Sequence, residues 1–163
     1  MIILGIDPGI ATMGYGIIKE DKGNYEAIDY GVLSTHKDLS VTERLVLVAK
    51  GVKQLIEKFK PDTIAVEELF FSSNRKTAML VSQARGVILL ICHDAGVPIS
   101  EYTPNQIKQA VSGYGSADKR QVQQMVRMLL RLTSVPKPDD AADALAIALC
   151  HGQTGRFSTL FRV

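Results

Sequence analysis

The chain begins with the heptapeptide MIILGID, residues 1–7, in which an uninterrupted apolar run leads directly to the carboxylate of Asp7. Its isoleucine content and its length predict a buried strand. An acid at the end of such a strand is unusual, because removing a charged group from water is costly unless a partner or an ion compensates it. Asp7 is therefore a candidate site residue.

The same pattern recurs twice. The short run TIAVE, residues 63–67, is almost wholly apolar and ends on Glu67, while Asp140 and Asp143 stand at the start of the apolar stretch 141–149. The two aspartates are three residues apart on a predicted helix and therefore share a face. Acids from three distant segments, each at the edge of an apolar element, predict one shared metal site with oxygen ligands.

The order of predicted elements defines the fold class. Short connections join the first three predicted strands into an antiparallel meander, and helices separate the later strands. We expect an α/β fold whose mixed five-stranded sheet has three antiparallel strands followed by two parallel ones, with helices on both faces. If the first and fourth strands are neighbours, Asp7 and Glu67 meet. The predicted strands are 1–6, 14–19, 27–34, 63–67 and 99–102, and the predicted helices are 40–59, 76–95, 105–111, 119–132 and one beginning near 139.

Length and composition are those of one globular domain. The 163 residues are 46% hydrophobic and 22% charged, and no apolar run reaches the roughly 18 residues of a membrane span. We expect a single domain over residues 1–152 and a flexible C-terminal tail over 153–163. Cys92 and Cys150 have apolar neighbours and no metal-binding spacing, which predicts free core thiols in a reducing compartment, the cytoplasm.

Charge is divided unevenly along the chain. Residues 1–71 contain 8 basic and 11 acidic residues, 72–131 contain 8 and 3, and 132–163 contain 3 and 3. The basic middle section lies between the candidate acids in sequence. A basic patch beside an acidic cluster favours a metal-dependent enzyme that acts on a polyanion. Solvated helix faces are the alternative explanation.

Each acid also has a local structural explanation. Asp7 precedes a Pro-Gly pair and could form a turn, and Asp139 or Asp140 could cap the last helix. Glu67 competes with Glu68, and strand alternation sends these two side chains to opposite faces, so only one should join the site. Residue types and spacing leave these alternatives open.

Five short motifs follow one another along the chain, namely IDPG at 6–9, GYG at 14–16, VE at 66–67, QARG at 83–86 and DAADALA at 140–146. In order and spacing they resemble the RuvC family of bacterial Holliday junction resolvases. The resemblance extends from Met1 to about His151. It implies a ribonuclease H-like fold, a homodimer, and symmetric nicking of four-way DNA junctions that depends on Mg²⁺. Two Mg²⁺ ions per site, with Mn²⁺ able to substitute, and cooperation with the RuvA–RuvB branch-migration complex are part of the same expectation.

Carried over to this sequence, the resemblance assigns both catalysis and metal binding to Asp7, Glu67, Asp140 and Asp143. The family's wedge aromatic matches Phe70, and because Phe71 follows it, the ring that performs this role stays open. Two basic residues of the family match Lys108 and Lys119. Together with neighbouring basic residues, the predicted DNA-contacting set is Phe70, Phe71, Arg75, Lys76, Lys108, Lys119 and Arg120.

Three other functions are compatible with parts of the pattern. Asp7 and Gly9 resemble the phosphate loop of actin-like and sugar-kinase-like ATPases, although the chain is too short for two such domains. A ribonuclease H-like nuclease acting on RNA or flaps, and a junction-binding protein without catalysis, are the others. The stretch 87–92 is apolar nearly all round, which suits either a core helix or a two-fold interface.

Overall fold

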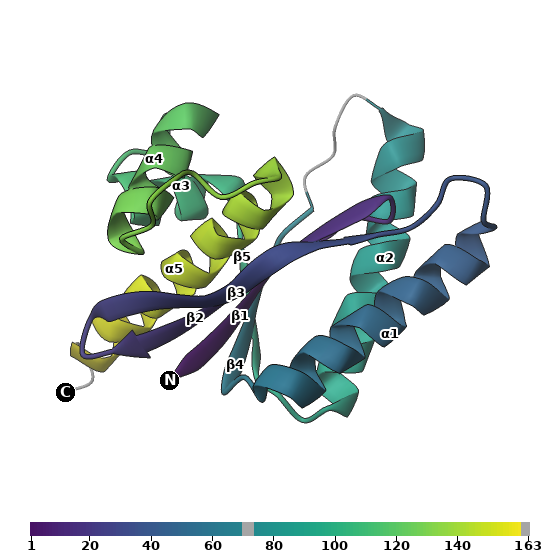
Figure 1. Ribbon diagram of the computed structural model, residues 1–163, viewed down its shortest axis with the longest axis horizontal. Helices are drawn as coiled ribbons and strands as arrows, with labels where there is room; N and C mark the ends of the chain where they lie inside the picture. Colours follow the sequence, from purple (N-terminus) through teal and green to yellow (C-terminus); the bar gives the residue numbers. More distant parts are fainter. Residues whose placement is uncertain (70–73, 161–163) are drawn as a thin grey trace.

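The computed structural model describes residues 1–69 and 74–160, with side chains described up to residue 155. In these residues a single five-stranded sheet lies between two groups of helices (Figure 1). This is the predicted fold class. The strands are β1 (Ile2–Asp7), β2 (Thr12–Asp21), β3 (Asn24–Ser34), β4 (Thr63–Glu67) and β5 (Ile99–Tyr102).

The strand order is β3-β2-β1-β4-β5, with antiparallel pairing among β1, β2 and β3 and parallel pairing of β1 with β4 and of β4 with β5. The predicted adjacency of the first and fourth strands is confirmed. Ile6 pairs with Val66, so the residues that follow them, Asp7 and Glu67, lie at the same edge of the sheet. The register of two buried strands thus brings together two acids that are distant in sequence.

The β2–β3 hairpin is longer than its sequence predicted. Its turn shrinks to Lys22 and Gly23, whose φ angles are 50° and 89°. Two-residue hairpin turns with both central residues at positive φ match the right-handed twist of the strands. The polar residues on either side of this turn therefore continue the ladder instead of forming a loop.

Two layers of helices cover the sheet. α1 (Val41–Phe59) and α2 (Arg75–Asp94) lie on one face, and α3 (Pro104–Ser112), α4 (Lys119–Leu129) and α5 (Asp139–Leu160) lie on the other (Figure 1). Side-chain caps begin several of them: Ser40, Thr103 and Asp118 each accept a hydrogen bond from the backbone N–H three residues later. Such caps satisfy donors that have no partner within the helix.

Helix α5 extends further than expected. The sequence predicted a flexible tail from residue 153, whereas residues 153–160 continue the helix to Leu160. Gly152 lies within the helix, and a Cβ at this position would lie 2.7 Å from Cε1 of Tyr25. It is a packing glycine, and the Thr154 hydroxyl donates to the Cys150 carbonyl oxygen at 2.8 Å in the following turn.

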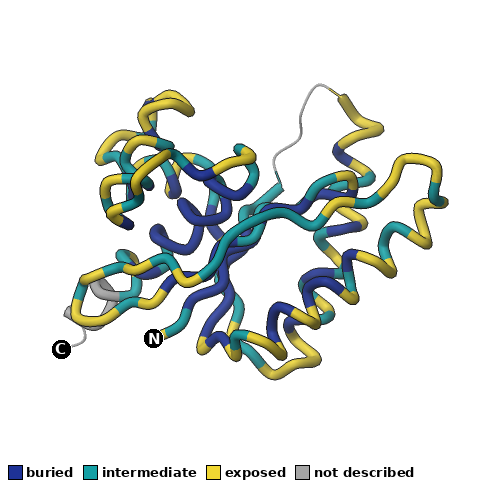
Figure 2. The backbone as a smooth tube through the Cα atoms, viewed as in Figure 1, coloured by how far each residue is buried: buried dark blue, intermediate teal, exposed yellow. Residues whose placement is uncertain are grey.

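The hydrophobic core is split by the sheet into two clusters, one under each helix layer. Burial is concentrated in α5 and the central strands (Figure 2). Cys92 and Cys150 are buried and free, as predicted. Among the described residues, no helix combines the length and the hydropathy that a membrane crossing requires.

A buried polar chain ties α5 to the parallel half of the sheet. Nδ1 of His151 lies 2.7 Å from the Tyr102 hydroxyl, and Nε2 lies 3.1 Å from the Thr63 hydroxyl. Burial lowers the pKa of His151, which keeps the ring neutral and able to accept one of these hydrogen bonds. These hydrogen bonds fix α5 against β4, which ends at Glu67, and against the neighbouring strand β5.

Candidate active site

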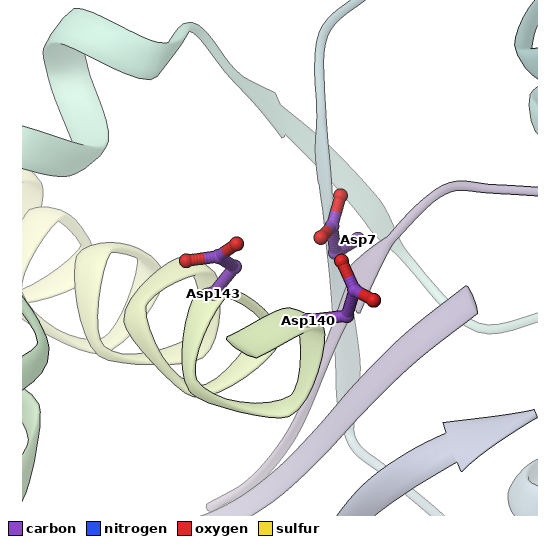
Figure 3. A group of neighbouring side chains, drawn as sticks. All are labelled: Asp7, Asp140 and Asp143. Atoms are coloured by element: carbon purple, nitrogen blue, oxygen red, sulfur yellow. The ribbon is translucent and has the colours of Figure 1, made fainter. Parts of the chain in front are cut away.

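Three carboxylates converge where β1 ends and α5 begins. Asp7, Asp140 and Asp143 each present an oxygen atom, and these atoms all lie within 4.8 Å of one another (Figure 3). Asp7 points from the strand toward the first turns of α5, which carry the other two side chains. Clustered carboxylate oxygens are the ligands that hard divalent cations such as Mg²⁺ take in proteins. The donor set therefore fits the predicted cation.

Two glycines allow α5 to lie this close to the strands. A Cβ at Gly14 of β2 would overlap the backbone carbonyl of Asp140, and a Cβ at Gly5 of β1 would overlap that of Ala144. Because both strand positions lack side chains, the helix backbone rests directly on the sheet. This packing role was not predicted from the sequence, although the GYG motif and the alanine-rich start of α5 are typical of such close contacts.

Glu67 approaches the same region from β4. It lines a cavity of about 300 Å³ together with Asp143, Lys108 and Lys119, but lies outside the group of three clustered aspartates. Glu68 is not among the residues that line this cavity, and its backbone N–H donates to the Tyr102 carbonyl oxygen at 2.8 Å. The structure thus brings Glu67 to the acidic site and places Glu68 outside the cavity wall.

The acids repel one another strongly. Burial, followed by the charges of Glu67 and Asp143, raises the pKa of Asp7 to about 8. Burial and the charge of Asp143 likewise raise the pKa of Glu67 to about 6 against the opposing effect of two nearby lysines. The pKa of Asp143 is also raised, chiefly by burial. A bound cation would relieve this repulsion and hold the carboxylates ionised.

Lys119 forms ion pairs with two aspartates at the start of α5. Its Nζ lies 3.3 Å from Oδ2 of Asp143 and 3.5 Å from Oδ2 of Asp139. Burial lowers the pKa of Lys119, but the two aspartates outweigh this effect and raise it overall. Asp139 also pairs with Lys137 at 3.4 Å, and its pKa is lowered mainly by Lys119. Asp139 is therefore a partner of lysines and stands apart from the three clustered acids.

The predicted DNA-contacting residues fall into three groups. Lys108 and Lys119 line the acidic cavity, and Arg120 follows Lys119 in the first turn of α4. Arg75 and Lys76 begin α2, where both are exposed, and they do not line this cavity. Phe70 and Phe71 lie outside the described residues. The structure thus brings two of the predicted basic residues to the acids.

A mixed five-stranded sheet with acids converging from β1, β4 and α5 is the arrangement of ribonuclease H-like, metal-dependent nucleases. Comparison with known proteins identifies the family within this class of nucleases. The family model of the crossover junction endodeoxyribonuclease RuvC matches residues 3–151. The chain belongs to the RuvC family and is a nuclease.

Individual members of the family are similar to this chain in sequence or structure over nearly its whole length. The crossover junction endodeoxyribonuclease RuvC of Alkaliphilus oremlandii is 52% identical over 163 residues, which are 100% of this chain and 99% of that protein. The structure of Thermus thermophilus RuvC superimposes with a TM-score of 0.90 at 39% identity, covering 98% of each chain. Thermus thermophilus RuvC in complex with Holliday junction substrate gives a TM-score of 0.89 at 35% identity, again covering 98% of each chain.

Proposed function

We propose that this protein resolves four-way (Holliday) DNA junctions by making symmetric nicks that leave 5′-phosphate and 3′-hydroxyl ends. The observation that carries the proposal is the convergence of Asp7, Asp140 and Asp143, with Glu67 and Lys119 at the wall of the adjoining cavity. The family's name and the junction complex of Thermus thermophilus RuvC support the choice of substrate. The four acids are the proposed catalytic residues.

The acids would hold the cofactor, which we propose to be two Mg²⁺ ions per site, with Mn²⁺ as a substitute. When bound, such ions would supply an activated water molecule and stabilise the leaving oxygen of a phosphodiester. Asp7 would be one of their ligands, because its carboxylate is close to Asp140 and Asp143 and interacts electrostatically with Glu67 on the next strand. Asp140, Asp143 and Glu67 would complete the ligand sets.

Two lysines would handle the phosphate. Lys108 and Lys119 line the same cavity as Glu67, and the ion pairs of Lys119 with Asp139 and Asp143 hold its ammonium at the edge of the acidic cluster. A cation fixed in this way can position the scissile phosphate and stabilise negative charge that develops during in-line attack. Neither lysine needs to move a proton for this role.

A two-fold arrangement of the enzyme would match the two-fold symmetry of the junction. Helix α2 buries Ile88 and Cys92 in the core but exposes the apolar side chains of Met79 and Leu90, at 66% and 58% respectively. Exposed apolar side chains on one helix favour association with a second copy. We propose a homodimer that uses this face of α2, so that two active sites cut two strands.

The remaining roles follow from the same substrate. We propose that Phe70 or Phe71 acts as the wedge at the point of strand exchange, and that Arg75, Lys76 and Arg120 contact the DNA. Handling of junctions in recombination and repair would pair the enzyme with the RuvA–RuvB complex and place it in the cytoplasm. All of these proposals depend on junction resolution being the function.

Substrate choice is tested by incubating the protein with matched synthetic substrates in Mg²⁺. A four-way junction, a linear duplex of the same sequence and an RNA–DNA hybrid would be compared. We expect paired nicks in the junction and no comparable cutting of the other two, with no cutting of any substrate in Ca²⁺. Preferential cutting of the hybrid, or hydrolysis of ATP without junction cutting, would replace the proposal with another function.

A further inference from the structure

A second cavity lies beside the acidic one, between the loop of residues 112–116 and helix α4. Its volume is about 380 Å³, within the range of sites that take small molecules or single chemical groups. Asp118 lines both cavities, so the two are adjacent. The side chains that line this cavity include those of Tyr114, Asp118, Arg120, Gln121, Gln124 and Met125.

Tyr114 presents an aromatic ring at this cavity from a backbone that is held in place. The ring belongs to a residue that is 63% exposed, so it does not serve the core. Gly113 ends α3 at a φ of 86°, and the Ser112 hydroxyl donates to the Tyr114 carbonyl oxygen at 3.0 Å. The N–H of Ala117 donates to the same carbonyl oxygen at 3.3 Å. An exposed ring on a fixed backbone is a surface on which a planar group can stack at little entropic cost.

The polar groups of the cavity suit a neutral ligand better than a phosphate. Arg120 forms no ion pair within the described part of the chain, and the carboxylate of Asp118 lines the same cavity, so the cavity carries charges of both signs. A reciprocal pair of hydrogen bonds, 2.8 Å and 2.9 Å long, joins Asp118 to Gln121 and fixes both side chains. A guanidinium, a carboxylate and amide groups together supply donors and acceptors that match the edge of a nucleobase.

We propose that this cavity receives one unpaired nucleobase from the DNA strand next to the scissile phosphate, stacked on Tyr114 and hydrogen-bonded at its edge by Arg120. The proposal rests on the proposed function, because the branch point of a junction is where unstacked bases are available. Met125 forms part of the apolar lining, and Gln121 and Gln124 add amide groups. A base held here would fix the position of the phosphate that enters the adjoining acidic cavity.

The test is a double-mutant cycle between Tyr114 and the DNA. Synthetic junctions would carry one abasic nucleotide at each position around the cut, and their affinities would be measured in Ca²⁺ for wild type and Tyr114→Ala. Stacking of one base on an aromatic ring predicts a loss of roughly 5- to 100-fold for Tyr114→Ala on the intact junction. A single abasic position should cost wild type a similar factor. When Tyr114→Ala binds a junction that is abasic at that position, the loss of affinity should be little greater than for either change alone.

Controls separate stacking from folding and from phosphate binding. Tyr114→Phe keeps the ring and should bind like wild type, as should Met128→Ala, which removes a comparably exposed (64%) side chain of α4 outside the cavity lining. Losses that add fully at every abasic position, or wild-type affinity for Tyr114→Ala, would overturn the proposal. Junction cleavage by wild type in Mg²⁺, measured alongside, shows whether the proposed function holds independently of the base cavity.

Discussion

At Asp7 the requirements of metal binding and of stability conflict, because a metal ligand must be ionised and burial disfavours the ionised form. It ends a buried strand, and burial together with the neighbouring acids raises its pKa to about 8. In the folded protein without a cation, ionising this carboxylate is therefore costly. A bound cation would compensate the negative charge and stabilise the ionised carboxylate. This dependence on a cation is expected of a metal ligand and not of an acid that only ends a strand.

Replacing Asp7 with asparagine should stabilise the metal-free protein. The folded state holds the Asp7 proton up to about pH 8, whereas the unfolded chain loses it near its usual pKa of 3.8. Stability of wild type should therefore fall as pH rises between about 4 and 8. We expect Asp7→Asn to flatten this decline and to raise Tm at pH 8 by roughly 5 °C, as measured by calorimetry in EDTA.

Asp139→Asn is the matched control for that measurement. The same type of substitution removes an exposed carboxylate whose pKa is lowered, mainly by Lys119, so its charge favours the folded state. This variant should show no rise in Tm at pH 8. An equal rise in both variants would indicate that general negative charge, and not burial at the site, is responsible.

At the scale of elements, the site depends on how α5 lies against β1 and β2. The acids at the ends of apolar runs, and the adjacency of β1 and β4, could be predicted because hydrophobic pattern and connection length are local properties of the sequence. The close approach of α5 at Gly5 and Gly14 could not, because it depends on which helix backbone faces each glycine. The length of α5 was underestimated for a related reason. A glycine such as Gly152 is typical of a helix end, and its packing against Tyr25 is a tertiary contact that the sequence does not show.

Gly14→Ala should damage the site without touching any ligand. The added methyl group would overlap the Asp140 carbonyl, so the start of α5 must shift away from β2. Overpacking of this kind costs about 1–3 kcal/mol, which corresponds to a fall in Tm of roughly 3–10 °C. We also expect the Mg²⁺ concentration needed for half-maximal thermal stabilisation to rise by about 10-fold or more.

Gly155→Ala in α5 provides the comparison, because no atom of the described residues lies within 4 Å of a Cβ built at that position. It should leave the Mg²⁺ response unchanged and, as an alanine in a helix, should not lower Tm. If Gly14→Ala responds to Mg²⁺ as wild type does, the contact between α5 and β2 is not what positions the acids.

At the scale of the whole molecule, the exposed apolar side chains of α2 and the acidic site lie with helices on opposite faces of the sheet. One face carries α1 and α2, with exposed apolar side chains on α2, and the other carries α3, α4 and α5 beside the acidic edge (Figure 1). The basic middle section of the sequence includes α3 and α4, which bring Lys108 and Lys119 to the cavity that Glu67 and Asp143 line. Charges that are separated along the chain thus become neighbours in the fold.

The most direct test of the central claim compares wild type with Asp7→Asn on a synthetic four-way junction. Binding would be measured in Ca²⁺ and cleavage in Mg²⁺, with the same protein and DNA concentrations. If the converging carboxylates hold the catalytic cation, Asp7→Asn should bind the junction within about 3-fold of wild type. It should cut the junction roughly 100- to 1,000-fold more slowly, which is the usual cost of removing one electrostatic contributor from an active site. Cleavage by Asp7→Asn at the wild-type rate would contradict the assignment of the acidic cluster as the active site.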